Sequence, residues 1–336
     1  MRKLASLAMA FCLTVTGAAF IPGQAQAEPI VLKMACDSPV GLATDIGARE
    51  FKRLVEERSK GKYRVDQFLG QSFGSPESIY QALMLGSIHF NLQTTSQLSS
   101  MTPSLQLFDC PGVFPSEAAF EHIIRGKVGR ELLPELSDKR VTFLGFTCVM
   151  PRVVWTRMPC KNLDELQKKK IRTTSSKMHI ATINNLGMTA VPMPWPETFT
   201  ALQQGVVDGH DSTIVSCAPQ RITEVAPYVV ESEHLAFSEA FEVATRWWNK
   251  LSEEDRAMFQ SCVDDSIAMI RKIHDEKDKA ECRQSVIDQG AKIITLSPEE
   301  KREWFNRNKD TYKDFPAVKP EWIKMIHDEL QAAGLE

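Results

Sequence analysis

The chain has 336 residues, of which 43% are hydrophobic, with 40 basic and 43 acidic side chains and a formal net charge of −3. This length is comfortable for two lobes that each bury a core. The weakly acidic balance excludes the basic surface that nucleic acids and anionic membranes attract, so we expect no nucleic-acid partner.

Residues 1–27 have the parts of a secretory signal peptide. Arg2 and Lys3 supply the positive start, an apolar run follows over 4–20, and a small-x-small cleavage site precedes Glu28. The alternative is a membrane anchor, for which the apolar run is short. We expect cleavage, export to a bacterial periplasm, and a mature net charge of −5, because loss of two basic residues leaves 38 against 43 acids.

The remaining chain alternates strand and helix patterns. In the first half the patterns predict strands at 30–35, 62–69, 88–92 and 141–148, and helices at 43–58, from Ser75, at 116–126 and at 128–137. In the second half they predict strands at 152–156, 170–173, 189–192, 206–208 and 291–295, and helices from Asn162, at 177–186, at 197–204, from Ser297 and after Pro320. Such alternation is typical of βα units with largely parallel sheets.

A charged helical pattern without Gly or Pro runs from about 247 to 288. At 1.5 Å per residue such a helix reaches ~60 Å, which is longer than one small domain. No flexible linker separates two halves of the chain. We therefore predict an α/β fold of two lobes, with crossover strands, a hinge and a long helix spanning both lobes.

Removal of the signal peptide leaves seven cysteines and no Cys-x-x-Cys motif. Zinc-ribbon, thioredoxin-like and haem-attachment sites are therefore excluded, and we expect no metal and no cofactor. An odd number leaves at least one unpaired thiol, and most of the seven lie in apolar stretches typical of small buried hydrophobes. Cys148 and Cys160 flank a predicted strand pair and are candidates for a disulfide.

Two arginines occupy strand-like positions, Arg152 in one strand and Arg172 at the end of another. A guanidinium presents a planar fork of donors that matches a carboxylate, so a convergent pair indicates capture of a small anion. Arg172 ends an apolar strand and cannot be buried without an anionic partner. Trp195 stands between two prolines, on a turn, where it either walls a pocket or plugs a lobe.

The segment from Lys170 to Gly209 resembles the solute-binding proteins of TRAP transporters, the C4-dicarboxylate-binding type. The shared pattern is an arginine strand, a helix, a Pro-Met-x-aromatic turn, an Ala-Leu-Gln-x-Gly helix and a Val-Asp-Gly strand end. The resemblance extends from Leu32 to the terminal helix. It implies a type II-like periplasmic binding protein, for which we expect lobe I at 28–149 plus about 238–277 and lobe II at 150–237 plus about 278–336.

The resemblance also implies roles for individual residues. Arg172 would form a bidentate pair with a ligand carboxylate, and Arg152 would be a second arginine near the ligand. Trp195 would wall the pocket, and Ser212 stands where many relatives have an asparagine that bonds the ligand. The first lobe would add polar contacts from Asp37 and Thr94.

This chain departs from the family pattern at Asp208-Gly-His-Asp-Ser-Thr213, where relatives often read Asp-Gly-Gln-Glu-Asn-Pro. His210 and Ser212 replace an amide pair, so the second half of the ligand site is altered, and His210 would add a donor that senses pH. His210 and Asp211 together also suggest a catalytic acid–base pair. However, no nucleophile accompanies the pair, and the chain has no Gly-x-Ser-x-Gly, His-Glu-x-x-His or phosphate-loop motif.

We therefore predict a periplasmic solute-binding protein, not an enzyme, that captures a small organic acid by an arginine clamp in an interlobe cleft. Carboxylates are the expected ligands, and sulfonates also fit the guanidinium fork. The expected partner is the membrane part of a TRAP-type transporter, and we expect a monomer. The alternatives are an ABC-type receptor, against which the Arg172 to Gly209 motif argues, and a secreted hydrolase or lyase that uses His210 and Asp211.

Overall fold

A computed structural model describes residues 28–70, 72–137 and 140–335, so the expected signal peptide at 1–27 lies outside the described residues. The strands form one mixed sheet of nine strands in the order β2-β1-β3-β8-β4-β7-β5-β6, with β9 paired to β8. The strands are β1 Ile30–Cys36, β2 Tyr63–Leu69, β3 Phe90–Thr94, β4 Val141–Thr156, β5 Lys170–Thr173, β6 Thr189–Pro192, β7 Gly209–Ser212, β8 Tyr228–Ala244 and β9 Lys292–Thr295.

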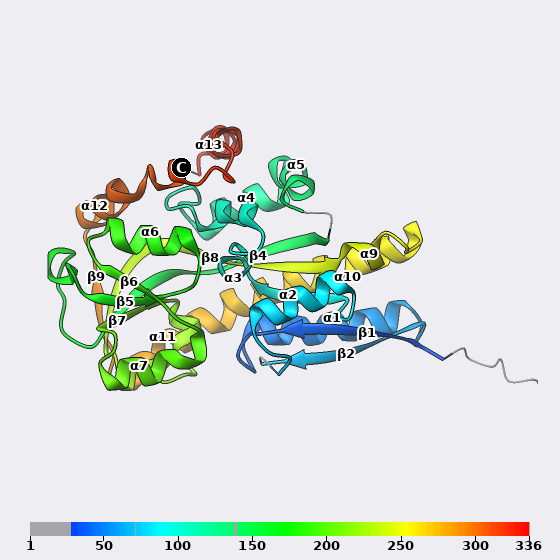
Figure 1. The fold of residues 1–336 in the computed structure, drawn as a ribbon, viewed down its shortest axis with the longest axis horizontal. Helices are drawn as coiled ribbons and strands as arrows, with labels where there is room; N and C mark the ends of the chain where they lie inside the picture. Colours follow the sequence, from blue (N-terminus) through cyan, green and yellow to red (C-terminus); the bar gives the residue numbers. More distant parts are fainter. Residues whose placement is uncertain (1–27, 71, 138–139, 336) are drawn as a thin grey trace, which may run out of the picture.

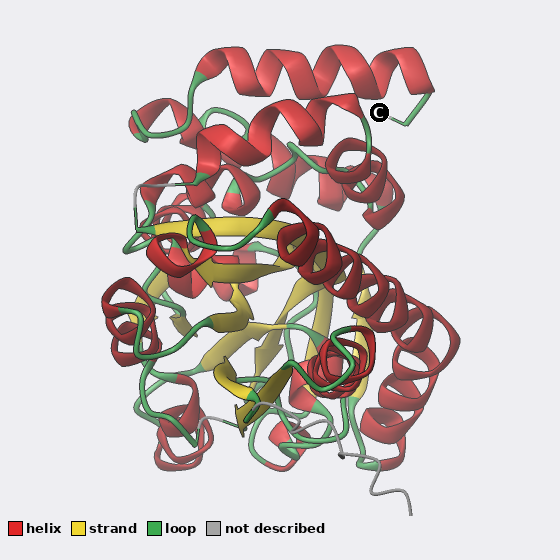
Figure 2. Ribbon diagram, turned by 90° about the vertical axis from the view of Figure 1, so that its right-hand side faces the viewer, coloured by secondary structure: helices red, strands yellow, loops and turns green. Residues whose placement is uncertain are grey.

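Helices surround the strands in the described part of the chain (Figure 2). They are α1 Ala43–Arg58, α2 Pro76–Leu85, α3 Thr95–Leu98, α4 Glu117–Arg125, α5 Lys127–Leu136, α6 Lys177–Asn185, α7 Thr198–Gln204, α8 Ile214–Cys217, α9 Thr245–Trp248, α10 Glu253–Ile273, α11 Lys279–Asp288, α12 Pro298–Asn308 and α13 Pro320–Ala333. Short 3-10 turns include η1 Pro103–Asp109, η2 Asp164–Leu166 and η3 Trp195–Glu197. Where a helix was expected from Asn162, the structure has only the short 3-10 turn η2. Among the described residues, none of the helices has the length and apolarity needed to cross a bilayer.

Two long antiparallel strands, β4 and β8, cross the middle of the molecule (Figure 1). Toward one end β8 pairs with β3, and toward the other end β4 pairs with β7 and β8 with β9. We call the part built on β1, β2 and β3 the first lobe and the part built on β5, β6 and β7 the second lobe. The two-lobe α/β fold with crossover strands is thus confirmed.

Strand directions place the inner ends of both lobes at one point. In the first lobe β1 is parallel to β2 and β3, and in the second β5 is parallel to β6 and β7. The carboxyl end of β3 pairs at Glu239 of β8, and the carboxyl end of β7 pairs at Val153 of β4. Both ends therefore point to the middle of the crossover strands. Ligands of open α/β sheets bind at such carboxyl ends.

The long helical segment begins at Glu253 and not at 247. Ser252 caps it, because its hydroxyl accepts from the backbone N–H of Asp255 at 3.1 Å, and α9 is a separate turn. After α10 the backbone passes through a π-helical segment, His274–Asp278, into α11. Because α10 packs against α1 and β4 while α11 packs against α8, the segment spans both lobes as predicted.

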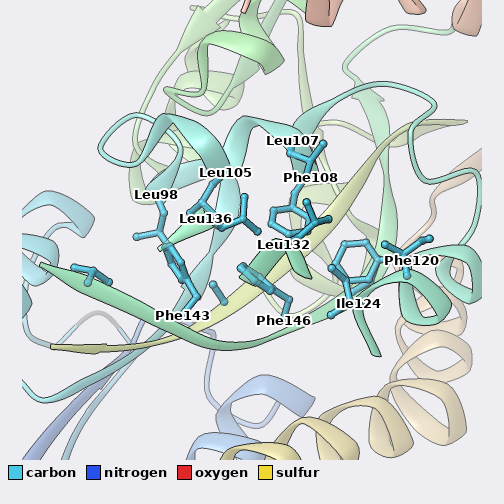
Figure 3. Close-up of a cluster of buried hydrophobic side chains, with 14 of the residues drawn as sticks. Leu98, Leu105, Leu107, Phe108, Phe120, Ile124, Leu132, Leu136, Phe143 and Phe146 are labelled. Atoms are coloured by element: carbon cyan, nitrogen blue, oxygen red, sulfur yellow. The ribbon is translucent and has the colours of Figure 1, made fainter. Parts of the chain in front are cut away.

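Each lobe has its own buried apolar clusters. Figure 3 shows one first-lobe cluster, in which the rings of Phe108 and Phe146 are tilted against each other with centroids 4.5 Å apart. Trp322 and Ile326 of α13 belong to the same cluster, and α13 packs against α4 and α5. The exact lobe boundaries remain a proposal. Because of this packing we propose that residues 320–333 belong to the first lobe, although the sequence had led us to expect them in the second.

The seven cysteines in the described residues are all buried, and none of them forms a disulfide. Cys148 belongs to the same first-lobe cluster as Phe108, and Cys160 belongs to a second-lobe cluster. The candidate disulfide between them is therefore absent, and the interpretation of the thiols as small buried hydrophobes is confirmed.

Candidate functional site

A cavity of about 70 Å³ lies at the middle of the crossover strands, between the two lobes. Because one water molecule needs roughly 10–15 Å³ of such space, the cavity has room for several water molecules and hence for a small ligand. Six of the residues that line it are among those predicted from sequence: Asp37, Thr94, Arg152, Arg172, Trp195 and Ser212. The polar side chains of Thr44, Glu239 and Asp278 also line it.

Arg172 is a buried cation whose charge is not neutralised by the protein. It lies on β5 between β6 and β7, and its side chain is 3% exposed. Nε and Nη2 donate to the carbonyl oxygen of Met193 at 2.9 and 2.6 Å, and the Trp195 ring centroid is 5.6 Å from the guanidinium. Within the described part of the chain no carboxylate forms an ion pair with it. Burial, together with nearby Arg152, lowers the pKa of Arg172 to about 10.

Arg152 has an internal counter-ion. Its Nε lies 2.8 Å from Asp211 Oδ1 and its Nη2 lies 3.1 Å from Asp211 Oδ2, a bidentate pair. Asp211 also accepts from the Thr173 hydroxyl at 2.7 Å, and His234 Nε2 is 3.2 Å away. Burial opposes ionisation of this carboxyl, yet Arg152 and His234 hold the pKa of Asp211 well below its usual range. The charge of Arg152 is therefore already balanced where it lines the cavity.

His210 and Asp211 do not line the cavity, although both were expected at the site. His210 is fully buried behind Trp195, with ring centroids 5.2 Å apart, and neither of its ring nitrogens has a hydrogen-bond partner among the described residues. Burial and the positive charge of Arg172 lower the pKa of His210 well below its usual range. A buried neutral imidazole behind the wall neither contacts the ligand space nor presents a base to it.

The wall contributed by the first lobe is acidic. Asp37 follows β1, and Glu239 lies on β8 opposite Thr94, where its Oε2 accepts from the Thr44 hydroxyl at 2.7 Å. Burial raises the pKa of Asp37 to about 7 and that of Glu239 to about 8. Sequence reasoning missed Glu239 because β8 was not recognised as a strand. The sequence feature that could have revealed Glu239 is an acidic residue placed among the apolar residues between Ala236 and Phe241.

Comparison with known proteins identifies the family and the fold of the chain. Residues 39–317 match the family model of bacterial extracellular solute-binding protein, family 7, named DctP. The chain belongs to this family. Residues 28–70, 72–137 and 140–335 of this family 7 protein contain no cluster of three or more His, Cys, Asp or Glu side chains arranged to hold a metal.

Curated relatives of the family 7 protein include C4-dicarboxylate-binding periplasmic proteins DctP. The protein from Shewanella loihica is 28% identical over 269 residues, which cover 80% of each chain. The protein from Rhodobacter capsulatus is 27% identical over 286 residues, covering 83% of this chain and 84% of the relative. The resemblance seen in the sequence from Lys170 to Gly209 is thus confirmed at the level of the family.

Solved structures of TRAP periplasmic solute-binding proteins share the fold. One from Shewanella oneidensis with bound succinate has a TM-score of 0.83 at 27% identity and covers 90% of this chain and 99% of its own. One from Bradyrhizobium with bound galacturonate has a TM-score of 0.82 at 26% identity, with 89% and 100% covered. The sugar-acid-binding protein DctPAm of Advenella mimigardefordensis, at 23% identity and a TM-score of 0.84, shows the fold alone, with 91% and 99% covered.

Proposed function

We propose that this family 7 protein captures a small organic acid, a carboxylate or a sulfonate, through Arg172 in the interlobe cavity. One observation carries the proposal: Arg172 is 3% exposed, lines the cavity, and has no acidic partner in the described residues. A buried guanidinium is costly unless an anion pairs with it, so the cavity favours an anionic guest. Met193 fixes the plane of the guanidinium by accepting two of its N–H groups, which orients the fork before a ligand arrives.

The surrounding residues support this role. Trp195 lies over the guanidinium and forms part of the cavity wall, and the Ser212 hydroxyl lies on the same wall at the end of β7. Asp211 neutralises Arg152, so Arg152 acts as a positioning residue that shapes the wall beside Arg172. Only one strong anion site is thereby left in the cavity, which favours one acidic group per ligand at this end.

Delivery to a membrane transporter completes the proposal. A cavity between two lobes joined by continuous strands is suited to closure about a hinge, with β4 and β8 as the connection. The closed, loaded form would dock on TRAP-type membrane subunits in the periplasm after removal of residues 1–27. We expect a monomer that presents both lobes to the transporter.

The test is a thermal-shift screen of residues 28–336 against small carboxylates, keto acids, sugar acids and sulfonates, followed by calorimetry. A ligand at one hundred times its dissociation constant adds about 2.7 kcal/mol to the free energy of unfolding. Loss of a bidentate charge-assisted contact in Arg172→Ala should weaken binding by at least ~100-fold. Arg302→Ala, at an exposed arginine of α12 that pairs with Glu299, is the matched control and should bind as wild type.

The outcomes are distinct. If Arg172→Ala binds as tightly as the wild type, the site assignment is wrong. If none of the anions shifts the midpoint, the proposal of an acid ligand fails. Analysis of the solution after binding separates capture from catalysis, because a binding protein returns its ligand unchanged whereas a hydrolase or lyase does not.

A further inference from the structure

The two walls of the site cavity differ in chemistry, because one presents a cation and the other presents acids. On the second-lobe wall, Arg172 is the cation that no acid of the described chain neutralises, since Arg152 is paired with Asp211. Three acids stand on the opposite wall, and none of them forms an ion pair with a Lys, Arg or His within the described residues: Asp37, Glu239 and Asp278. The cavity therefore has a cationic end and an end lined by acids.

The three acids come from separate elements that meet at the cavity. Asp37 follows β1, Glu239 is on β8, and Asp278 ends the π-helical segment between α10 and α11. Two of the acids have neutral hydrogen-bond partners: Thr44 donates to Glu239 at 2.7 Å, and the backbone N–H of Ala43 donates to Asp278 at 2.9 Å. Burial raises the pKa of both Asp37 and Glu239, as expected for acids that face no cation.

Resting on the proposed capture of a carboxylate by Arg172, we propose that the ligand is a small zwitterion. Its carboxylate would pair with Arg172, and a protonated amine at its other end would be received by Asp37, Glu239 and Asp278. A dicarboxylate spanning the cavity would place its second carboxylate among these three acids, where neighbouring carboxyl groups disfavour one another's ionised form. A hydroxyl would satisfy the acids as a donor, but a charge-assisted hydrogen bond is roughly twice as strong as a neutral one.

Probes matched in length isolate the contribution of the far end. The four-carbon set is 4-aminobutyrate, 4-hydroxybutyrate, succinate and butyrate, and the three-carbon set is β-alanine, 3-hydroxypropionate, malonate and propionate. Within a set only the group distal to one carboxylate changes. We expect the amine to bind at least about tenfold more tightly than the hydroxyl and the diacid in the better-fitting set, as one charge-assisted bond predicts.

Two variants test the acids directly. Glu239→Gln and Asp37→Asn should each lower the affinity of the amine probe by about tenfold and narrow the gap between amine and diacid. Glu233→Gln is the matched control, because Glu233 is an exposed residue of the same strand that pairs with Lys301 away from the cavity. The control should preserve the order of affinities.

The results separate this inference from the proposed function. Amine preference that falls in Glu239→Gln and Asp37→Asn supports the zwitterion. Succinate, malonate or a hydroxy acid binding most tightly, with binding lost in Arg172→Ala, overturns the zwitterion and leaves acid capture standing. An amine preference that the two variants do not alter overturns the assignment of the acidic wall. Binding that survives in Arg172→Ala overturns both. If neither probe set binds, the small zwitterion is overturned, and the wider screen of acids decides the proposed function.

Discussion

Arg152 and Asp211 form a bidentate ion pair between β4 and β7, with Nε and Oδ1 2.8 Å apart and side-chain exposures of 2% and 0%. The pair joins the crossover strand to the strand that ends at the cavity. Removing one partner of such a pair leaves a buried charge without compensation. The pair is therefore a structural support of the wall on which Arg172 stands.

We predict that Asp211→Asn lowers the free energy of unfolding by about 3–5 kcal/mol, because Arg152 is left buried and unpaired. Chemical denaturation at pH 7 measures this. The matched control is Asp66→Asn, which removes an exposed pair with Arg64 at 3.2 Å and should cost at most about 1 kcal/mol. Equal losses in the two variants would show that the buried pair has no special role.

The way in which the free energy of unfolding falls at acidic pH should differ between wild type and Asp211→Asn. The folded pKa of Asp211 is depressed, so its carboxylate contributes stability that is present above the unfolded pKa, about 3.9, and is lost as pH falls further. The difference in unfolding free energy between the two proteins should therefore shrink below pH 4. A difference that stays constant from pH 7 to pH 3 contradicts this assignment.

In the ligand-free protein, Glu239 should make stability fall as pH rises, which is opposite to the effect of Asp211. Its folded pKa, about 8, is raised above the ordinary 4.5, so unfolding is favoured as pH rises between these values. Gln at this position cannot ionise. We predict that Glu239→Gln matches wild type near pH 4.5 and is more stable at pH 8, where each tenfold change in the acid constant corresponds to about 1.4 kcal/mol.

Thermal unfolding across pH 4.5 to 9 is the measurement. The groups that act on Glu239 are Thr44, whose hydroxyl donates to it, and Asp37, whose negative charge adds to the effect of burial. Glu233→Gln, on the exposed part of the same strand, is the control and should follow the wild type. If the unfolding midpoints of Glu239→Gln and wild type changed in parallel across this pH range, Glu239 would not be buried in its protonated form.

Local patterns were sufficient to predict the parallel strands and Arg172. The segment around β5 and β6 carries its own turn and helix signals, so neither depends on distant contacts. β7 was expected at 206–208 but lies at Gly209–Ser212, a polar stretch that becomes a strand because β4 and β5 pair with it on both sides. Tertiary pairing of this kind leaves no trace in local periodicity.

The crossover strands were the harder part to predict. Pro151 interrupts the apolar pattern of β4 beside register shifts in its pairing with β8, so one strand was predicted as two. β8 mixes apolar residues with Glu231, Glu239 and Glu242, which hides its strand pattern, and of these three Glu239 lines the cavity. His210 was expected at the ligand, but it lies two positions before the end of β7 and is covered by Trp195.

A polar contact between the lobes should control closure. Asp109, at the end of η1 in the first lobe, accepts from the Ser176 hydroxyl at 2.7 Å, and Ser176 caps α6 in the second lobe. Asp109 also accepts from Ser99 of its own lobe at 3.0 Å. These two serines share one acceptor, but only Ser176 bridges the lobes.

We predict that Ser176→Ala weakens ligand binding and broadens the solution shape of the loaded protein, whereas Ser99→Ala lowers stability without a comparable loss of affinity. Asp109 keeps Ser99 as a donor in Ser176→Ala, so the loss is that of one hydrogen bond to a charged group, about 1.5–3 kcal/mol. Calorimetry gives the affinities, and small-angle scattering with ligand gives the radius of gyration. Equal affinity losses in both variants would mean that the contact supports folding and not closure.

The buried thiols should be inert in the native protein. All seven described cysteines are buried outside any disulfide, and burial raises the pKa of Cys160, Cys262 and Cys282 to about 11. The thiolate is the reactive form, so native protein should react slowly with a thiol reagent, and a reductant should leave the unfolding midpoint unchanged. Denatured protein, prepared without reductant, should titrate all seven thiols. Five thiols in that titration, together with a midpoint lowered by reductant, would instead indicate a disulfide such as Cys148 with Cys160.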